Sequence, residues 1–72
     1  MPLAEVHEMR EKLLGPLMPY LREAMSYGDE YGERAFYIIA DYAMGFISRR
    51  EAERRLQALL ARARRERGKH GR

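Results

Sequence analysis

The segment from Gly45 to Ala52 ends one helix and starts another within a short stretch of chain. Gly45 predicts the end of the first helix, because glycine adopts the left-handed conformation common at helix C-termini. Ser48 is a preferred N-cap residue, and Glu51 stands three positions later, which completes the pattern of a capping box. Since only three or four residues separate the two predicted helices, we expect them to form an antiparallel hairpin.

The two helices of this expected hairpin differ in their apolar patterns. The first should run to about Met44 and is apolar nearly all round, so we expect it to be buried on both sides. A chain of 72 residues has few helices with which to cover both sides of this one. A second subunit or another protein could cover one of the two sides. The second helix is expected to span Arg49 to about Glu66. Its predicted buried stripe consists of Ala52, Leu56, Leu59, Leu60 and Ala63.

Two further helices are predicted nearer the N-terminus. Apolar residues recur at helical spacing from Leu3 to Leu14, and Gly15 and Pro16 then interrupt the pattern. A second helix is expected to begin between Pro16 and Tyr20. The alternative is one long helix that is kinked between Pro16 and Pro19, because the apolar phase is roughly kept across the break.

The predicted fold class is all-α: a small bundle of three or four helices that ends in an antiparallel helical hairpin and carries a basic C-terminal tail. Residues 26–32 are expected to form a loop, with Asp29 capping the next helix. We expect residues 1–66 to form one helical domain and residues 67–72 a flexible tail. A domain of this size buries only ~60% of the surface of its unfolded chain, so a homodimer is the expected route to further stability.

Few side chains are suited to covalent chemistry or to metal binding. The sequence has no cysteine, which excludes disulfides, thiolate zinc sites and thiol nucleophiles. His7 and Glu11 stand one helical turn apart, but two ligands are too few for a metal site. Ser26 and Ser48 are the only hydroxyl nucleophiles besides tyrosine, and Ser48 is assigned to a cap. We therefore expect a protein that is not an enzyme and holds no metal or cofactor.

The apolar runs of the chain are short. The longest extends from Ala35 to Ala40, whereas a membrane helix needs about 20 apolar residues. The first residues also lack the basic and long apolar stretches of a signal peptide. We therefore expect a cytoplasmic protein that does not enter a membrane. The absence of Asn and Thr, together with many charged residues, suits a thermophilic source.

Charge is distributed very unevenly along the chain. Residues 1–48 carry four basic and eight acidic side chains, whereas residues 49–72 carry ten basic and three acidic ones, a net charge of +7. Such a basic end favours a polyanionic partner, because guanidinium groups bind phosphate as planar forks. The predicted nucleic-acid contacts are Arg50, Arg54, Arg55, Arg62, Arg65, Arg67 and Lys69.

This arginine-rich surface carries no known base-reading motif. Binding would therefore follow backbone charge, with little sequence preference and a strong dependence on salt. The alternative interpretation is a solvated helix face that keeps the protein soluble. Tyr27 and Tyr31 suggest base stacking, although packing is the more frequent role of tyrosine.

A second function class is a protein-binding module, such as an inhibitor, an antitoxin-like partner or an assembly subunit. The predicted interface is the outer face of the apolar third helix, with Tyr37, Ala40 and Met44, because aromatic residues and methionine are enriched in protein interfaces. The alternative is that the first two helices cover this face within the monomer.

Overall fold

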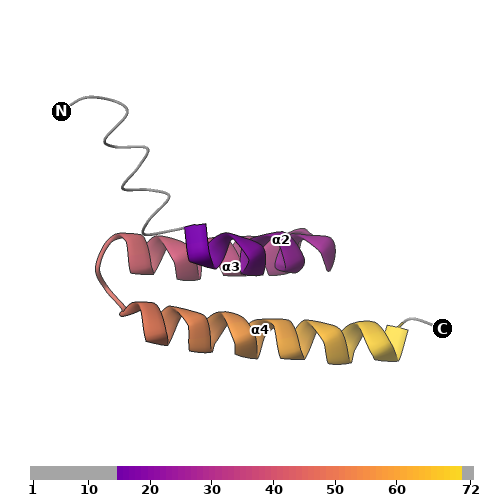
Figure 1. Cartoon of the computed structure of the whole chain (residues 1–72). Coiled ribbons are helices and arrows are strands. Elements are labelled where there is room, and N and C mark those ends of the chain that lie inside the picture. The colour runs from indigo at the N-terminus through magenta and orange to yellow at the C-terminus, as the bar shows by residue number, and fades with distance from the viewer. Residues whose placement is uncertain (1–14, 71–72) are drawn as a thin grey trace.

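The computed structural model describes residues 15–70, with side chains up to Arg67, and every regular element among them is helical. A 3₁₀ turn η1 (Gly15–Leu17) leads into α2 (Met18–Ser26), α3 (Asp29–Ala43) and α4 (Arg49–His70) (Figure 1). The all-α prediction is therefore confirmed for this part of the chain. The helix predicted over residues 3–14 lies outside the described residues.

The start of α2 agrees with the sequence prediction. Pro19 lies in the first turn of α2, where a missing backbone N–H costs no helical hydrogen bond. Gly15–Leu17 forms the preceding 3₁₀ turn, and Leu17 is already fully buried. The second helix thus begins between Pro16 and Tyr20, as expected.

The predicted loop over residues 26–32 is much shorter in the structure. Only Tyr27 and Gly28 separate α2 from α3. The prediction that Asp29 caps α3 is wrong, because Gly28 is the N-cap residue and Asp29 is the first residue of the helix. Gly28 has a φ of 129°, a conformation that L side chains rarely adopt. Glycine at this position allows the chain to reverse direction in two residues, so α3 starts earlier than expected.

Gly45 ends α3 as predicted. Its φ is 82°, and its N–H donates to the carbonyl of Tyr42 at 3.0 Å, while Phe46 N–H donates to that of Asp41 at 2.9 Å. These two hydrogen bonds form a Schellman motif, which satisfies carbonyls at the end of the helix. The chain then turns, and α4 runs back along α3 (Figure 1).

The core lies where α2, α3 and α4 meet, and about half of its buried side chains are alanine. Such short side chains allow the helix axes to approach closely. Four of the five residues in the stripe predicted for α4 are buried, and Leu59 is half-buried against the core. The buried apolar residues are Leu17, Ala24, Ala35, Ile39, Ala52, Leu56, Leu60 and Ala63.

The last helix is longer than predicted. It continues to His70, four residues beyond the expected end at Glu66. Arginine and lysine favour this continuation, because both form helices well and their charges suit the C-terminal end of the helix dipole. The mobility expected for residues 67–72 stays a prediction.

Gly32 of α3 lies close to Met25 of α2. A Cβ atom at this position would lie 2.9 Å from Met25 Cγ and 3.4 Å from Met25 Cα. A substitution of Gly32 therefore pushes the two helices apart, although most residues favour a helix more than glycine does.

We expect Gly32→Val to lower the free energy of unfolding by about 1–3 kcal/mol, the usual cost of overpacking. Urea denaturation followed by circular dichroism measures this change. Gly15→Val is the control, because a Cβ at Gly15 meets nothing within 4 Å. Equal effects of the two substitutions would contradict the close helix contact.

Candidate nucleic-acid interface

The first turn of α4 is fixed by a cap. Ser48 Oγ accepts a hydrogen bond from Glu51 N–H at 3.1 Å, and the Ser48 carbonyl accepts one from Ala52 N–H at 2.9 Å. This is one half of the predicted capping box. In place of the other half, the Glu51 carboxylate contacts arginine side chains of the next turn.

Glu51 is shared by two guanidinium groups. Arg54 donates to both carboxylate oxygens, at 3.0 and 2.6 Å, and Arg55 Nε donates to Oε2 at 2.7 Å. The hydrogen bonds from Arg54 and Arg55 lower the pKa of Glu51 to about 2, and the bond to Glu51 raises the pKa of Arg54. Because one carboxylate meets two cations, this cluster keeps a net positive charge.

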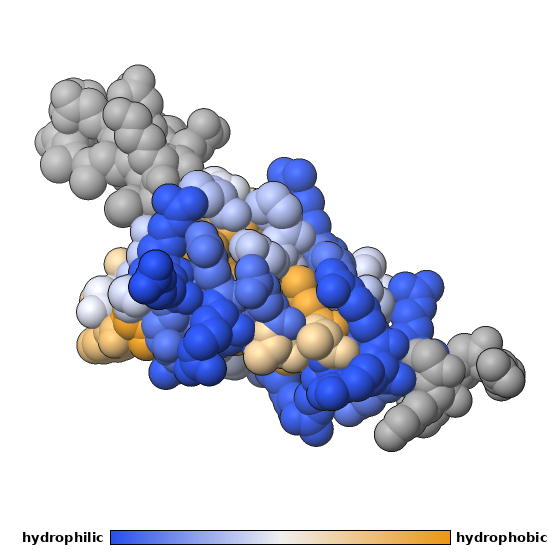
Figure 2. Space-filling model, turned by 60° about the horizontal axis from the view of Figure 1, so that its bottom comes forward, coloured by the Kyte–Doolittle hydropathy of each residue, from blue (hydrophilic) through white to orange (hydrophobic). Residues whose placement is uncertain are grey.

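The solvent side of α4 carries the remaining positive charge. Arg50 and Arg65 are exposed and form no ion pair with any residue that the structure describes. The 100° spacing of a helix places them on the side opposite the buried stripe, in line with Arg54. Exposed Ala58 and Ala61 lie between them on this side. Figure 2, which turns the α4 side of Figure 1 towards the viewer, shows mainly hydrophilic residues there.

Arg50 and Arg65 are fifteen positions apart, which corresponds to about 22 Å along a helix. We define the outer face of α4 by Arg50, Arg54, Ala58, Ala61 and Arg65. It is a straight surface with guanidinium groups towards both ends and only methyl side chains in the middle.

The last third of α4 is tied to the other two helices. Arg64 donates through Nε to Glu23 of α2 at 2.8 Å, and this contact raises the pKa of Arg64. Tyr31 of α3 donates its hydroxyl to Glu66. Arg64 was not among the predicted nucleic-acid contacts. Its hydrogen bond to Glu23 joins α4 to α2, which gives this arginine a structural role.

The remaining predicted contacts lie at the edges of the outer face or outside the described part. Arg62 pairs with Glu66 at 3.3 Å, and Arg55 lies on the same side of the helix beside Glu51. The Arg67 guanidinium lies 5.5 Å from the centre of the Tyr27 ring, a cation–π contact. The side chain of Lys69 lies outside the described residues.

Tyr27 and Tyr31, the predicted stacking residues, are both half-buried against the core. Tyr27 donates its hydroxyl to Glu23 at 3.1 Å. The hydrogen bond from Tyr31 to Glu66 raises the pKa of Tyr31. Both rings line a cleft of about 330 Å³ that Arg67 also borders. These contacts favour the packing role, because a stacked base would have to displace Arg67 from the Tyr27 ring.

The predicted protein interface on α3 is exposed only in part. Tyr37 is 58% exposed and Met44 is 62% exposed, while Ala40 is half-buried. Within the described residues, α3 is therefore covered on one side only, and cover of its other side by a second subunit or another protein stays a prediction. Sequence reasoning missed Phe36 and Phe46, which are also exposed. The nearly all-apolar pattern of α3 was the signal that could have identified Phe36.

The described side chains, from Gly15 to Arg67, include no group of three or more His, Cys, Asp or Glu residues placed to bind a metal ion. The pair of His7 and Glu11 lies outside the described residues. Within residues 15–70, no helix has the length and apolar character that a membrane crossing requires.

Comparison with protein-family models, with curated proteins and with solved structures found no match to this chain. Its function is therefore inferred from its own geometry and charge.

We expect the contribution of the Glu51 cluster to stability to depend on pH. The pKa of Glu51 is lowered in the folded protein from 4.5 to about 2, so its ionised form stabilises the fold. This stabilisation is present above the unfolded pKa and disappears as the pH falls towards about 2. The stability difference between the unchanged chain and Glu51→Gln should therefore narrow between pH 4.5 and about 2.

Urea denaturation at a series of pH values measures this difference. Glu33→Gln removes one exposed carboxylate from α3 and controls for the general effect of charge. A gap between the unchanged chain and Glu51→Gln that stays constant over the same pH range would contradict the prediction.

Proposed function

We propose that this protein binds nucleic acid through the outer face of α4, as a small accessory or regulatory protein without enzymatic activity. The observation that carries this proposal is the exposure of Arg50 and Arg65, which form no ion pair among the described residues. Arg54 lies in line with them and shares its carboxylate partner with Arg55. Arg50 and Arg65 are available to phosphate while the bonds between helices stay in place.

The charge balance of α4 supports the same proposal. Residues 49–67 contain eight arginines, and the carboxylates in contact with them are Glu23, Glu51, Glu53 and Glu66. Four positive charges therefore remain unbalanced. Phosphates that bind them release condensed counterions from the nucleic acid, which drives binding at low salt.

The shape of the outer face favours contact with a phosphate backbone. Ala58 and Ala61 are exposed and present no long side chain, so a rod-like polyanion can approach the helix between its two arginine-bearing ends. Binding of this type reads backbone charge and not base sequence. A homodimer would place two such faces in one particle and raise the avidity for a long polyanion. A cytoplasmic location is part of this proposal.

A protein-binding module is the second candidate function. It is favoured by the exposure of Tyr37, Met44 and Phe46, since isolated monomers rarely leave several large apolar side chains close together in water. Phe36 and Tyr37 also contact each other edge to face, with ring centres 6.0 Å apart. Recovery of one defined protein partner after nuclease treatment, abolished by Tyr37→Ser/Met44→Ser, would favour this function.

We expect Arg50→Gln/Arg65→Gln to weaken binding to duplex DNA and to flatten its salt dependence. For B-DNA, the slope of log K against log salt changes by about 0.9 for each phosphate that the protein no longer neutralises, so the double substitution should change it by about two. Fluorescence anisotropy at several salt concentrations measures the slope.

The matched control is Arg22→Gln/Arg34→Gln, which removes the same charge from α2 and α3. It should leave the slope nearly unchanged. Equal weakening in both variants would indicate a general charge effect. No binding by the unchanged chain, even at low salt, would reject the proposed function.

We expect Glu51→Gln to act in the opposite direction. It removes the carboxylate that Arg54 and Arg55 share, so both guanidinium groups become available to phosphate. Binding to duplex DNA should be tighter and its salt slope steeper than for the unchanged chain. Glu33→Gln on α3 makes the same change in net charge, and an equal increase in affinity from it would contradict a role of the α4 cluster.

A further inference from the structure

The solvent side of α3 carries an apolar stripe. Tyr37, Ala40 and Met44 stand three or four positions apart, so they lie within about 60° of one another around the helix axis. Tyr37 and Met44 are more than half exposed, and Ala40 between them is half-buried. The fully buried Ala35 lies on the other side of the helix. We call Tyr37, Ala40 and Met44 the α3 stripe.

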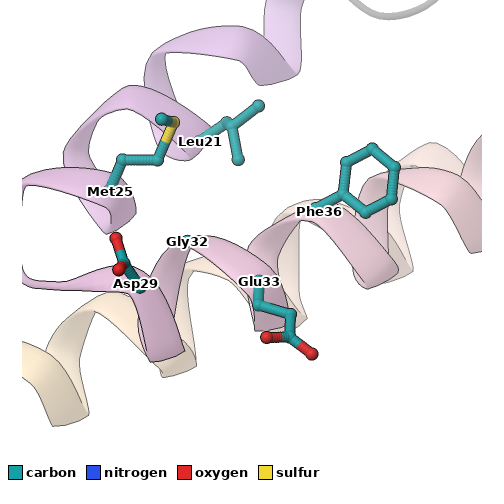
Figure 3. A pocket seen from close by; sticks show the side chains of 6 residues that line it. All are labelled: Leu21, Met25, Asp29, Gly32, Glu33 and Phe36. Atoms are coloured by element: carbon teal, nitrogen blue, oxygen red, sulfur yellow. The ribbon is translucent and has the colours of Figure 1, made fainter.

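Phe36 extends this apolar surface towards α2. It is 57% exposed, and its ring contacts that of Tyr37 edge to face. Phe36 also borders a groove of about 260 Å³ between α2 and α3, with Leu21 and Met25 on the α2 side (Figure 3). Met25 is 61% exposed. Apolar surface of this extent is stabilised when another apolar surface covers it.

Two residues of opposite charge flank the α3 stripe on the side away from Phe36. Arg34 and Asp41 are seven positions apart, so they project in nearly the same direction and lie about 10 Å apart along the helix. Arg34 pairs with Glu30 one turn earlier, whereas Asp41 forms no ion pair with any residue that the structure describes. A copy of α3 that runs in the opposite direction would present Asp41 to Arg34 and Arg34 to Asp41. This edge is therefore complementary in charge to itself.

We propose that a second copy of this chain covers the α3 stripe, and that the two α3 helices pack antiparallel about a two-fold axis. In this pair, Arg34 faces the partner's Asp41, and Tyr37 faces the partner's Ala40. Each contact forms twice, because a two-fold interface uses the same surface of both copies. A large ring against a small methyl group lets the two stripes interdigitate, and the ion pairs at the edge fix the orientation.

Charge favours the antiparallel orientation over the parallel one. In a parallel pair, Glu33 would face the partner's Glu33, and Asp41 would lie beside the partner's Phe36. In the antiparallel pair, Glu33 lies towards the partner's Met44 at the end of the contact, and the two helix dipoles oppose each other. Only this orientation supplies Asp41 with a cation.

The proposed contact leaves the outer face of α4 exposed in both copies, because the two surfaces share no residue. The proposal identifies the protein partner of the exposed α3 residues as the chain itself, and it does not depend on nucleic-acid binding. Its test therefore contains no nucleic acid, so a negative result would leave the function proposed for α4 unaffected.

The test is the molar mass of the full chain, measured by light scattering and sedimentation equilibrium over a range of protein concentrations. Arg34→Glu and Asp41→Arg each bring like charges together at both ends of the contact. An equal mixture of the two variants restores opposite charges, because one copy then carries two acidic side chains and the other two basic ones. Arg22→Glu on α2 is the control, since it makes the same change in net charge as Arg34→Glu. Circular dichroism confirms that each variant is folded.

We expect the unchanged chain and Arg22→Glu to form dimers, and each of the two test variants to raise the dimer dissociation constant by about tenfold or more. The mixture should return to nearly the unchanged value. Recovery on mixing keeps the result informative, because a poorly folded variant would not regain its affinity. A monomer at every concentration would overturn the proposal and leave the α3 stripe to a different partner. A dimer that the test variants do not weaken, or that mixing does not restore, would overturn the antiparallel α3 contact.

Discussion

The packing of the α4 stripe against α2 and α3 is the interaction on which the rest of the structure depends. Ala52, Leu56, Leu60 and Ala63 are almost completely buried, and they recur on one side of the helix. Once this side is fixed, helical geometry determines the direction of every other side chain of α4. The arginines of the outer face point into solvent because the buried leucines and alanines occupy the opposite side of α4. The position of the outer face therefore follows from the packing of the core.

The carboxylates of the chain divide these arginines into two groups. Glu23 and Glu66 accept hydrogen bonds from residues on other helices, so they hold the last third of α4 in place. Glu51 and Glu53 pair with arginines of α4 itself, so these two carboxylates do not connect α4 to another helix. Arg64 thus joins two helices, whereas Arg50 and Arg65 form no ion pair among the described residues.

Local signals in the sequence predicted most of the helix ends and most of the core. Gly45 and Ser48 act through their immediate neighbours, so their roles can be read from a few residues. The start of α3 was predicted wrongly because two neighbouring residues are both common at the N-cap position. Aspartate is a preferred N-cap residue, but the structure places Gly28 there, with a positive φ, and Asp29 inside the helix. The pairing of Arg64 with Glu23 and of Tyr31 with Glu66 could not be predicted, since it depends on how the helices are placed in space.

The charged and apolar surfaces of the molecule belong to different helices. The outer face lies on α4. An apolar groove lined by Leu21, Met25 and Phe36 lies between α2 and α3, and the exposed Tyr37 and Met44 lie at α3 and its end. A partner on the outer face therefore need not compete for the groove. Tyr37 and Met44 line neither the groove nor the outer face, so a polyanion and a protein would contact separate parts of one small core.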